Sequence, residues 1–185
     1  MSVALAVAVL AGLLSTLNLA LTVGIVRRLR EQAAQPASAP KPITVKVMAQ
    51  PGDRPQPFTA VTTDGESVDQ SLLTGGRTLV GFMANGCSSC EERRPEFIQF
   101  AQRFAGGRDR VLVTVVTNTE DVSAEVGMLA PVARVVLQDR PGTEVAAAFG
   151  VTGYPAFAVL DADGTVLTSG TSVQDLDLTP ALVGL

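Results

Sequence analysis

Hydrophobic side chains follow two patterns along the chain, one long run at the N-terminus and shorter periodic runs after residue 42. Residues 2–26 carry no charged side chain. As a helix, these 25 residues span about 37 Å, which exceeds the roughly 30 Å hydrocarbon core of a bilayer. The run therefore predicts a single uncleaved membrane-spanning helix, within an anchor and basic flank at residues 1–30.

Two other interpretations of this run fit less well. A cleaved signal peptide has basic residues before a core of about 7–15 apolar residues, with a small-residue cleavage site close by. Here the first basic residue is Arg27, and the small-residue match at 37–39 lies far from the run and directly before Pro40. A buried helix of a globular domain usually carries a polar stripe. The run is interrupted only by Ser15, Thr16, Asn18 and Thr22.

A linker and a domain follow the anchor. Residues 31–42 read EQAAQPASAPKP, and three prolines among Ala and Gln predict a semi-extended spacer. Residues 43–185 contain the remaining periodic runs, and they form the predicted domain.

The runs of this domain alternate between strand-like and helix-like patterns. The uncharged, β-branched run VLVTVV at 111–116 is typical of a central strand, whereas the phenylalanines between 97 and 104 recur at helical spacing. Strands that alternate with helices and end in a hairpin predict an α/β domain, with a mixed central sheet flanked by helices. The expected strands are 43–47, 58–61, 66–68, 77–84, 111–116, 134–137, 156–160 and 165–168. The expected helices are 90–104, 123–129, 143–149 and a short one in the tail at 172–185.

Composition and charge remove several classes of function. The chain has no His and two Cys, which excludes a Ser-His-Asp triad, a Cys-His pair, a His-ligated haem and a Cys₄ metal centre. We therefore expect no metal and no cofactor. From Lys41 onward, 11 Lys and Arg stand against 17 Asp and Glu. Nucleic-acid binding needs a basic surface, so no nucleic-acid partner is expected.

The two cysteines form one local unit, Cys87-Ser88-Ser89-Cys90, between a predicted strand and a predicted helix. At a helix N-terminus, unpaired N–H groups and the helix dipole stabilise a thiolate, which makes Cys87 the predicted nucleophile. Cys90 lies one turn later and is predicted to resolve the mixed disulfide that Cys87 forms with a partner. Ser88 and Ser89 either donate hydrogen bonds to the Cys87 sulfur or are ordinary helix-start residues, and the sequence leaves both interpretations open.

Other interpretations of the cysteine pair are two thiols buried by chance, half of a zinc site completed by a second chain, and a static disulfide outside the cell. The placement of both cysteines at one strand–helix junction favours redox exchange.

These motifs resemble the thioredoxin superfamily, and most closely its membrane-anchored TlpA/ResA-like thiol-disulfide oxidoreductases, which have a redoxin or AhpC/TSA-like domain. The resemblance covers residues 52–170. It implies a thioredoxin-like fold in which Pro155 is a cis-proline facing the cysteines, and Tyr154 offers backbone groups to an extended substrate segment. The matching segments are GDRPQPF at 52–58 with Asp64-Gly65, RTLVGFMANGCSSC at 77–90, Pro95, and EVAAAFGVTGYPAFAVLDADG at 144–164.

The sequence departs from this family at three positions. Gly86 stands where thioredoxins usually have Trp, which removes an apolar contact surface next to Cys87. Gly81 and Arg93 stand where relatives have an acid that helps the second cysteine. The two glutamates after Cys90 are predicted to be solvated on the helix surface. The sequence therefore identifies no base for Cys90.

The resemblance implies a membrane-tethered thiol-disulfide oxidoreductase. It would exchange disulfides with disulfide- or thiol-bearing proteins as a reductase, be recharged by an upstream redox donor, and contact the membrane through residues 2–26. The family and the acidic, Lys-poor domain favour an extracytoplasmic location at the cell membrane. Arg27, Arg28 and Arg30 favour the opposite orientation, because basic flanks are enriched on the cytoplasmic side.

Three other classes share the fold. A peroxiredoxin-like peroxidase usually has Thr three residues before its reactive cysteine, where this chain has Ala84. Sco-type copper proteins use a CxxxC spacing and a His, and this chain has neither. A non-catalytic docking module would tolerate the loss of Cys87.

Overall fold

The computed structural model describes residues 46–117, 121–142 and 144–176, together with scattered positions between residues 5 and 22. The chain divides into two units, Met1–Thr44 and Val45–Leu185. The described positions of the first unit are helical and exposed. Within the described part of the chain, no helix has both the length and the apolar character needed to cross a bilayer. The predicted span at 2–26 lies partly outside the described residues, and the predicted linker at 31–42 lies wholly outside them.

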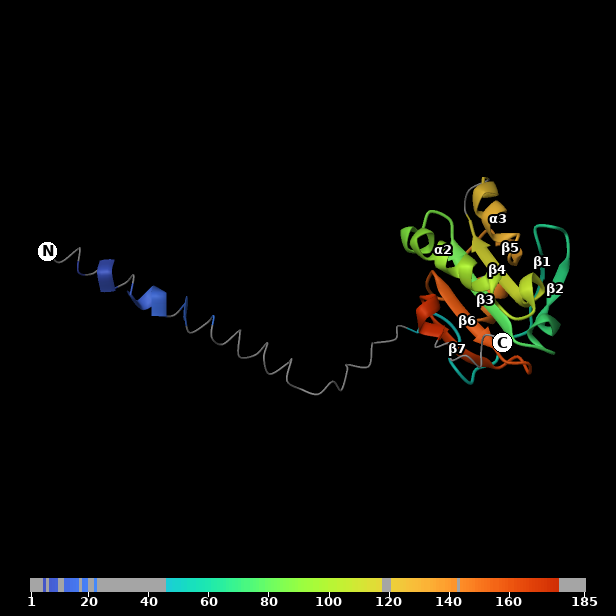
Figure 1. Ribbon diagram of the computed structural model, residues 1–185, viewed down its shortest axis with the longest axis horizontal. Helices are drawn as coiled ribbons and strands as arrows, with labels where there is room; N and C mark the ends of the chain where they lie inside the picture. Colours follow the sequence, from blue (N-terminus) through green and yellow to red (C-terminus); the bar gives the residue numbers. More distant parts are fainter. Residues whose placement is uncertain are drawn as a thin grey trace. The chain divides into compact units, whose positions relative to one another are not determined.

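A five-stranded mixed sheet forms the centre of the second unit. Its strand order is β5-β4-β3-β6-β7 (Figure 1). β3, β4 and β5 run parallel, whereas β6 runs antiparallel to both β3 and β7. This arrangement confirms the α/β class and the mixed sheet. The strands are β3 (Thr78–Ala84), β4 (Val111–Val116), β5 (Arg134–Gln138), β6 (Ala156–Leu160) and β7 (Val166–Gly170).

The hairpin and the helices around the sheet lie within about two residues of the ranges that the sequence predicts. A separate hairpin of β1 (Thr59–Val61) and β2 (Ser67–Asp69) turns at the first Asp-Gly pair. The helices are α2 (Ser88–Gln102), α3 (Ser123–Leu129) and α4 (Glu144–Ala148). Three short 3₁₀ helices complete the unit: η1 (Gln70–Leu73), η2 (Gly107–Arg110) and η3 (Val173–Leu176).

Both faces of the sheet are buried, because alternate residues of each strand point to opposite faces. In β3, Val80 and Phe82 pack with Phe149 after α4, whereas Leu79 and Met83 pack with Phe97 of α2. In Figure 1, α2 lies over the sheet. The second face positions the site, since it carries Gly81, Cys90 and the helix that begins at the cysteines.

The structure corrects three of the expected boundaries. Lys46 and Val47 are not in a strand, and residues 43–45 of that expected strand lie outside the described residues. The helix expected at 90–104 begins two residues earlier, because Cys87 caps it. The tail forms only η3, and residues 177–185 lie outside the described part.

Candidate active site

Cys87 caps the N-terminus of α2. Its sulfur accepts a hydrogen bond from the backbone N–H of Cys90 at 3.3 Å. Gly86 before it has φ +70, a conformation that L side chains rarely adopt, and open space surrounds its Cβ position. The approach to the half-buried Cys87 is therefore open on the side where thioredoxins usually have Trp.

Cys90 lies beneath Cys87 and is fully buried. Its sulfur accepts a hydrogen bond from the backbone N–H of Ala84 at 3.5 Å. Burial, together with the hydrogen bond and the charge of the neighbouring Cys87, raises the pKa of Cys90 to about 12, against the smaller lowering effects of Ala84 and Arg94. Both cysteines are free thiols in this structure. One thiol is thus accessible and placed at a helix N-terminus, and the other is kept neutral below it.

The two serines between the cysteines are exposed. Within the described part of the chain, the donor to the Cys87 sulfur is the Cys90 backbone N–H rather than the hydroxyl of Ser88 or Ser89. The role of Ser88 and Ser89 in tuning Cys87 stays a prediction.

Tyr154 and Pro155 lie beside Cys87. The peptide bond between them is cis, as the resemblance implies. The Cys87 thiol faces the Tyr154 carbonyl oxygen at a sulfur–oxygen distance of 3.9 Å. A strap at residues 46–49 holds this loop, since Thr152 donates its backbone N–H to the Val47 carbonyl at 2.8 Å. The fold therefore brings together residues 67 positions apart, and the substrate-binding role of Tyr154 and Pro155 stays a prediction.

The phenol ring of Tyr154 is the only tyrosine ring in the chain. Burial raises the pKa of Tyr154, the backbone of Gly142 lowers it, and the charge of Cys90 raises it. The raised pKa means that the phenol of Tyr154 stays protonated and uncharged at neutral pH.

The structure explains why Gly81 carries no acid. A Cβ atom at Gly81 would lie 3.0 Å from two ring atoms of Phe97. That ring stacks on Phe157 with a centroid distance of 5.2 Å. The place of a carboxylate is therefore filled by aromatic packing. The two glutamates after Cys90 are exposed, as expected.

Arg93 binds away from the sulfurs. Its guanidinium donates to the hydroxyl of Ser172 at 3.0 Å and to Gln174 at 3.4 Å. These contacts fasten α2 to the segment around η3, so Arg93 has a structural role in place of the acid found in relatives.

Two features of the site were missed by the sequence reasoning. Asn85 donates to the carboxylate of Glu125 at 2.7 Å, which links the cysteine loop to α3. Arg94, one turn after Cys90, is buried. Arg94 follows Cys90 by four residues, and this spacing places both residues on the same face of a helix. Nothing further in the sequence indicated burial, because an arginine on a helix usually lies on a solvated face.

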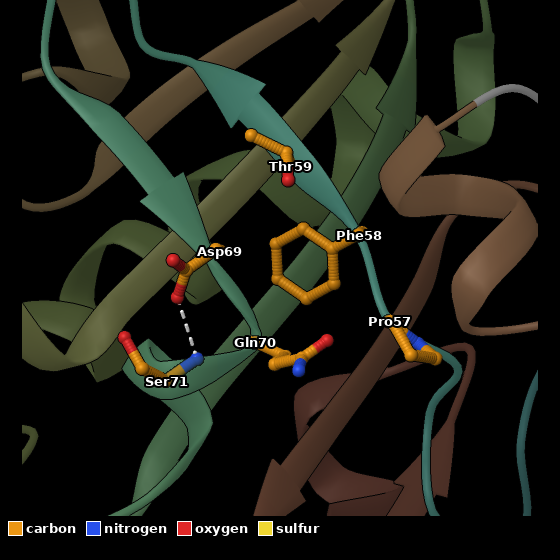
Figure 2. Close-up of a pocket in the computed structure, with 6 residues that line it drawn as sticks. All are labelled: Pro57, Phe58, Thr59, Asp69, Gln70 and Ser71. Carbon is orange, nitrogen blue, oxygen red and sulfur yellow. Dashed lines mark hydrogen bonds between the residues drawn. The ribbon is translucent and has the colours of Figure 1, made fainter.

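Figure 2 shows a pocket beside the β1–β2 hairpin and the start of η1. It has a volume of about 420 Å³ and is lined by residues 57–59 and 69–71. The pocket lies near the start of β3, because the Thr78 hydroxyl at the start of this strand donates to the Leu72 carbonyl of η1. The cysteines follow the other end of the same seven-residue strand, which spans roughly 23 Å. The Asp69 carboxylate in this pocket accepts from the backbone N–H of Ser71 at 2.7 Å, so it caps η1. The cysteine chemistry is not in this pocket.

The structure thus combines a thioredoxin-like α/β fold with a CxxC pair that directly follows β3. The chain belongs to the Redoxin family, whose model matches residues 50–180. No curated protein matches the chain.

Solved structures confirm the fold. The C-terminal domain of a putative thiol-disulfide oxidoreductase from Bacteroides thetaiotaomicron is 17% identical, with a TM-score of 0.54, over 69% of this chain and 90% of that chain. The thioredoxin domain of a thiol-disulfide oxidoreductase from Bacteroides vulgatus is 19% identical, with a TM-score of 0.51, over 68% and 91% of the two chains. A thiol:disulfide interchange protein from a Bacteroides species is 20% identical, with a TM-score of 0.51, over 65% and 81%.

Proposed function

We propose that this protein is a membrane-tethered thiol-disulfide oxidoreductase that reduces disulfides of partner proteins. One observation carries the proposal. A half-exposed Cys87 at the N-terminus of α2 lies directly above a buried Cys90 and beside the carbonyl of Tyr154. A nucleophilic thiol, a resolving thiol and a backbone acceptor for an extended partner segment are the parts that disulfide exchange needs.

The exchange proceeds in two displacements. The Cys87 thiolate attacks one sulfur of the partner disulfide, the partner's S–S bond breaks, and the other partner sulfur leaves as a thiolate. Cys90 then loses its proton and attacks the Cys87 sulfur in the mixed disulfide. The second partner sulfur leaves and takes up a proton through water. The partner gains two electrons, the pair becomes a Cys87–Cys90 disulfide, and an upstream dithiol donor must return it to the reduced state.

The reducing direction of this proposal is supported by the resemblance to membrane-anchored thiol-disulfide oxidoreductases.

The purified chain is expected to accelerate the reduction of insulin by dithiothreitol, and to consume hydrogen peroxide no faster than free dithiol does. The open site beside Cys87 suits a protein disulfide, and Ala84 stands where peroxiredoxins usually have Thr. Insulin precipitation and peroxide loss are measured on the same preparation. Peroxide turnover without insulin reduction would favour the peroxidase class, and the absence of both activities would favour a docking module.

Membrane tethering by residues 2–26 is supported by the apolar run and by the exposed side chains of its described part, such as Leu5, Leu13 and Leu19. In a chain that has lost both cysteines, Ser38→Cys in the predicted linker is expected to react with a membrane-impermeant maleimide in intact cells. A cysteine placed at Ser2 is the matched control and is expected to react only after lysis. The reverse labelling pattern would place the domain in the cytoplasm. Release of the chain from membranes by carbonate washing would contradict membrane tethering.

A further inference from the structure

Arg94 occupies an unusual place for an arginine. It lies between Cys90 and Phe97 on the buried face of α2, and only 9% of it is exposed. Its Nε atom is buried and has no hydrogen-bond partner. A buried cation without a counter-ion is costly, because the charge has lost its hydration.

Other arginines of the described domain have partners. Arg93 binds Ser172 and Gln174, and Arg108 and Arg134 form ion pairs with carboxylates. No carboxylate in the described part of the chain lies within ion-pair distance of Arg94; the pairs there belong to other cations. Among the described residues, the ionisable group on which Arg94 acts is the Cys90 thiol.

The groups that act on the Cys90 sulfur can be named from every side. α2 contributes Cys87 and Arg94, β3 contributes the backbone N–H of Ala84, and the cis-proline loop contributes the phenol of Tyr154. α3 carries Glu125, but its carboxylate is bound to Asn85. Among the described residues, no carboxylate contributes to the pKa of Cys90. Arg94 is the one cation among these groups.

We propose that Arg94 is a positioning residue for the second displacement, in which its guanidinium stabilises the Cys90 thiolate electrostatically in a site that lacks a buried acid or a His to accept the proton. This inference rests on the proposed function. In this proposal, electrostatic stabilisation by Arg94 takes the place of a general base. The Cys90 proton leaves through water, and the positive charge of Arg94 lowers the free energy of the Cys90 thiolate.

The timing follows from the chemistry of the pair. In the free dithiol, both the hydrogen bond and the charge of Cys87 oppose ionisation of Cys90. Once the Cys87 sulfur is covalently bound in the mixed disulfide, it carries no charge, so that opposition ends. The lowering effect of Arg94 on the pKa of Cys90 remains. Arg94 therefore acts most strongly in the intermediate that Cys90 must resolve.

The test follows two thiol releases in one reaction. The full chain has two cysteines, so one equivalent of dithiobis(nitrobenzoate) reports both displacements: Cys87 releases the first thionitrobenzoate and Cys90 releases the second. Arg94→Met keeps the apolar stem and removes the charge. Its second release is expected to be about tenfold slower at neutral pH, with the pH midpoint raised by about one unit, as expected for the loss of one nearby opposite charge. The first release is expected to be unchanged.

Arg93→Met is the matched control, because it removes a charge from the same turn of α2 without touching the sulfurs, and both releases are expected to keep their rates. Arg94→Lys is expected to restore most of the second release, and Arg94→Gln provides a second neutral variant. Circular dichroism verifies that each variant is folded. A second release in Arg94→Met with the natural rate and pH midpoint would overturn the role of Arg94. If the natural chain releases only one thionitrobenzoate, the proposed function itself fails.

Discussion

Cells that carry the Cys90→Ala chain are expected to accumulate a covalent adduct between Cys87 and a natural partner. Cys87 remains half-exposed at the N-terminus of α2, so the first displacement proceeds. Without the sulfur beneath it, the mixed disulfide has no internal route to resolution. The expected effect is close to all-or-none: insulin reduction falls to the background rate of dithiothreitol, and a higher-mass band appears on non-reducing gels. Mass spectrometry of that band identifies the partner and the cysteine that is attacked.

The matched control is Cys87→Ser combined with Cys90→Ala, which is expected to give no adduct because the nucleophile is missing. Cys87→Ser alone is also expected to give none, since the buried Cys90 is inaccessible to a partner. An adduct that persists without Cys87 would transfer the nucleophilic role to Cys90 and would contradict the assignment made here. If Cys90→Ala forms no adduct and the natural chain does not reduce insulin, the redox function is contradicted.

Gly81→Asp, which places a carboxylate where thioredoxins have their buried acid, is expected to destabilise the domain strongly rather than to assist Cys90. The new Cβ would meet the Phe97 ring at 3.0 Å. Phe97 and Phe157 are both fully buried and stacked, so neither ring has free space to enter. Overpacking and a buried charge together cost about 3–5 kcal/mol, a large part of the roughly 5–15 kcal/mol that stabilises a domain. Urea unfolding followed by circular dichroism measures this loss.

The matched control is Gly127→Asp on the exposed side of α3, where nothing lies within 4 Å of the added Cβ. Its stability is expected to change by less than about 0.5 kcal/mol. Combining Gly81→Asp with Phe97→Ala is expected to cost less than the sum of the two single changes, because the smaller side chain vacates the space that the carboxylate needs. A stable Gly81→Asp chain in which Cys90 resolves the mixed disulfide faster would contradict this prediction. It would show that the Phe97 ring can move to accommodate the carboxylate.

The hydrophobic pattern predicted most of the sheet. The run at 111–116 became β4 without change, and the strand at 156–160 became β6. Both are buried on two faces, and such strands are continuous apolar runs that a sequence shows directly. The pattern was wrong at 46–47, which pair with Thr152 outside any strand. That contact depends on where the cis-proline loop lies, which is not a local property of the segment.

The active-site pair was also predictable, whereas its surroundings were not. A CxxC unit between a strand and a helix places one sulfur at the cap and the other one turn below it, because helix geometry fixes that spacing. The orientation of Ser88 and Ser89 remained open in the sequence, since a helix-start hydroxyl has several partners within reach. In the structure both serines are exposed, and the Cys87 sulfur accepts its hydrogen bond from the backbone N–H of Cys90.

The sequence alone therefore determined the position of the two thiols at a strand–helix junction, the alternation of strands and helices, and the absence of His. Only the tertiary structure decided which groups surround the two sulfurs. It placed the Phe97 ring against Gly81, carried the Tyr154 carbonyl to Cys87 from 67 positions away, and buried Arg94 beside Cys90. These relations arise where α2 packs on the sheet, and local patterns do not encode which side chains meet across that interface.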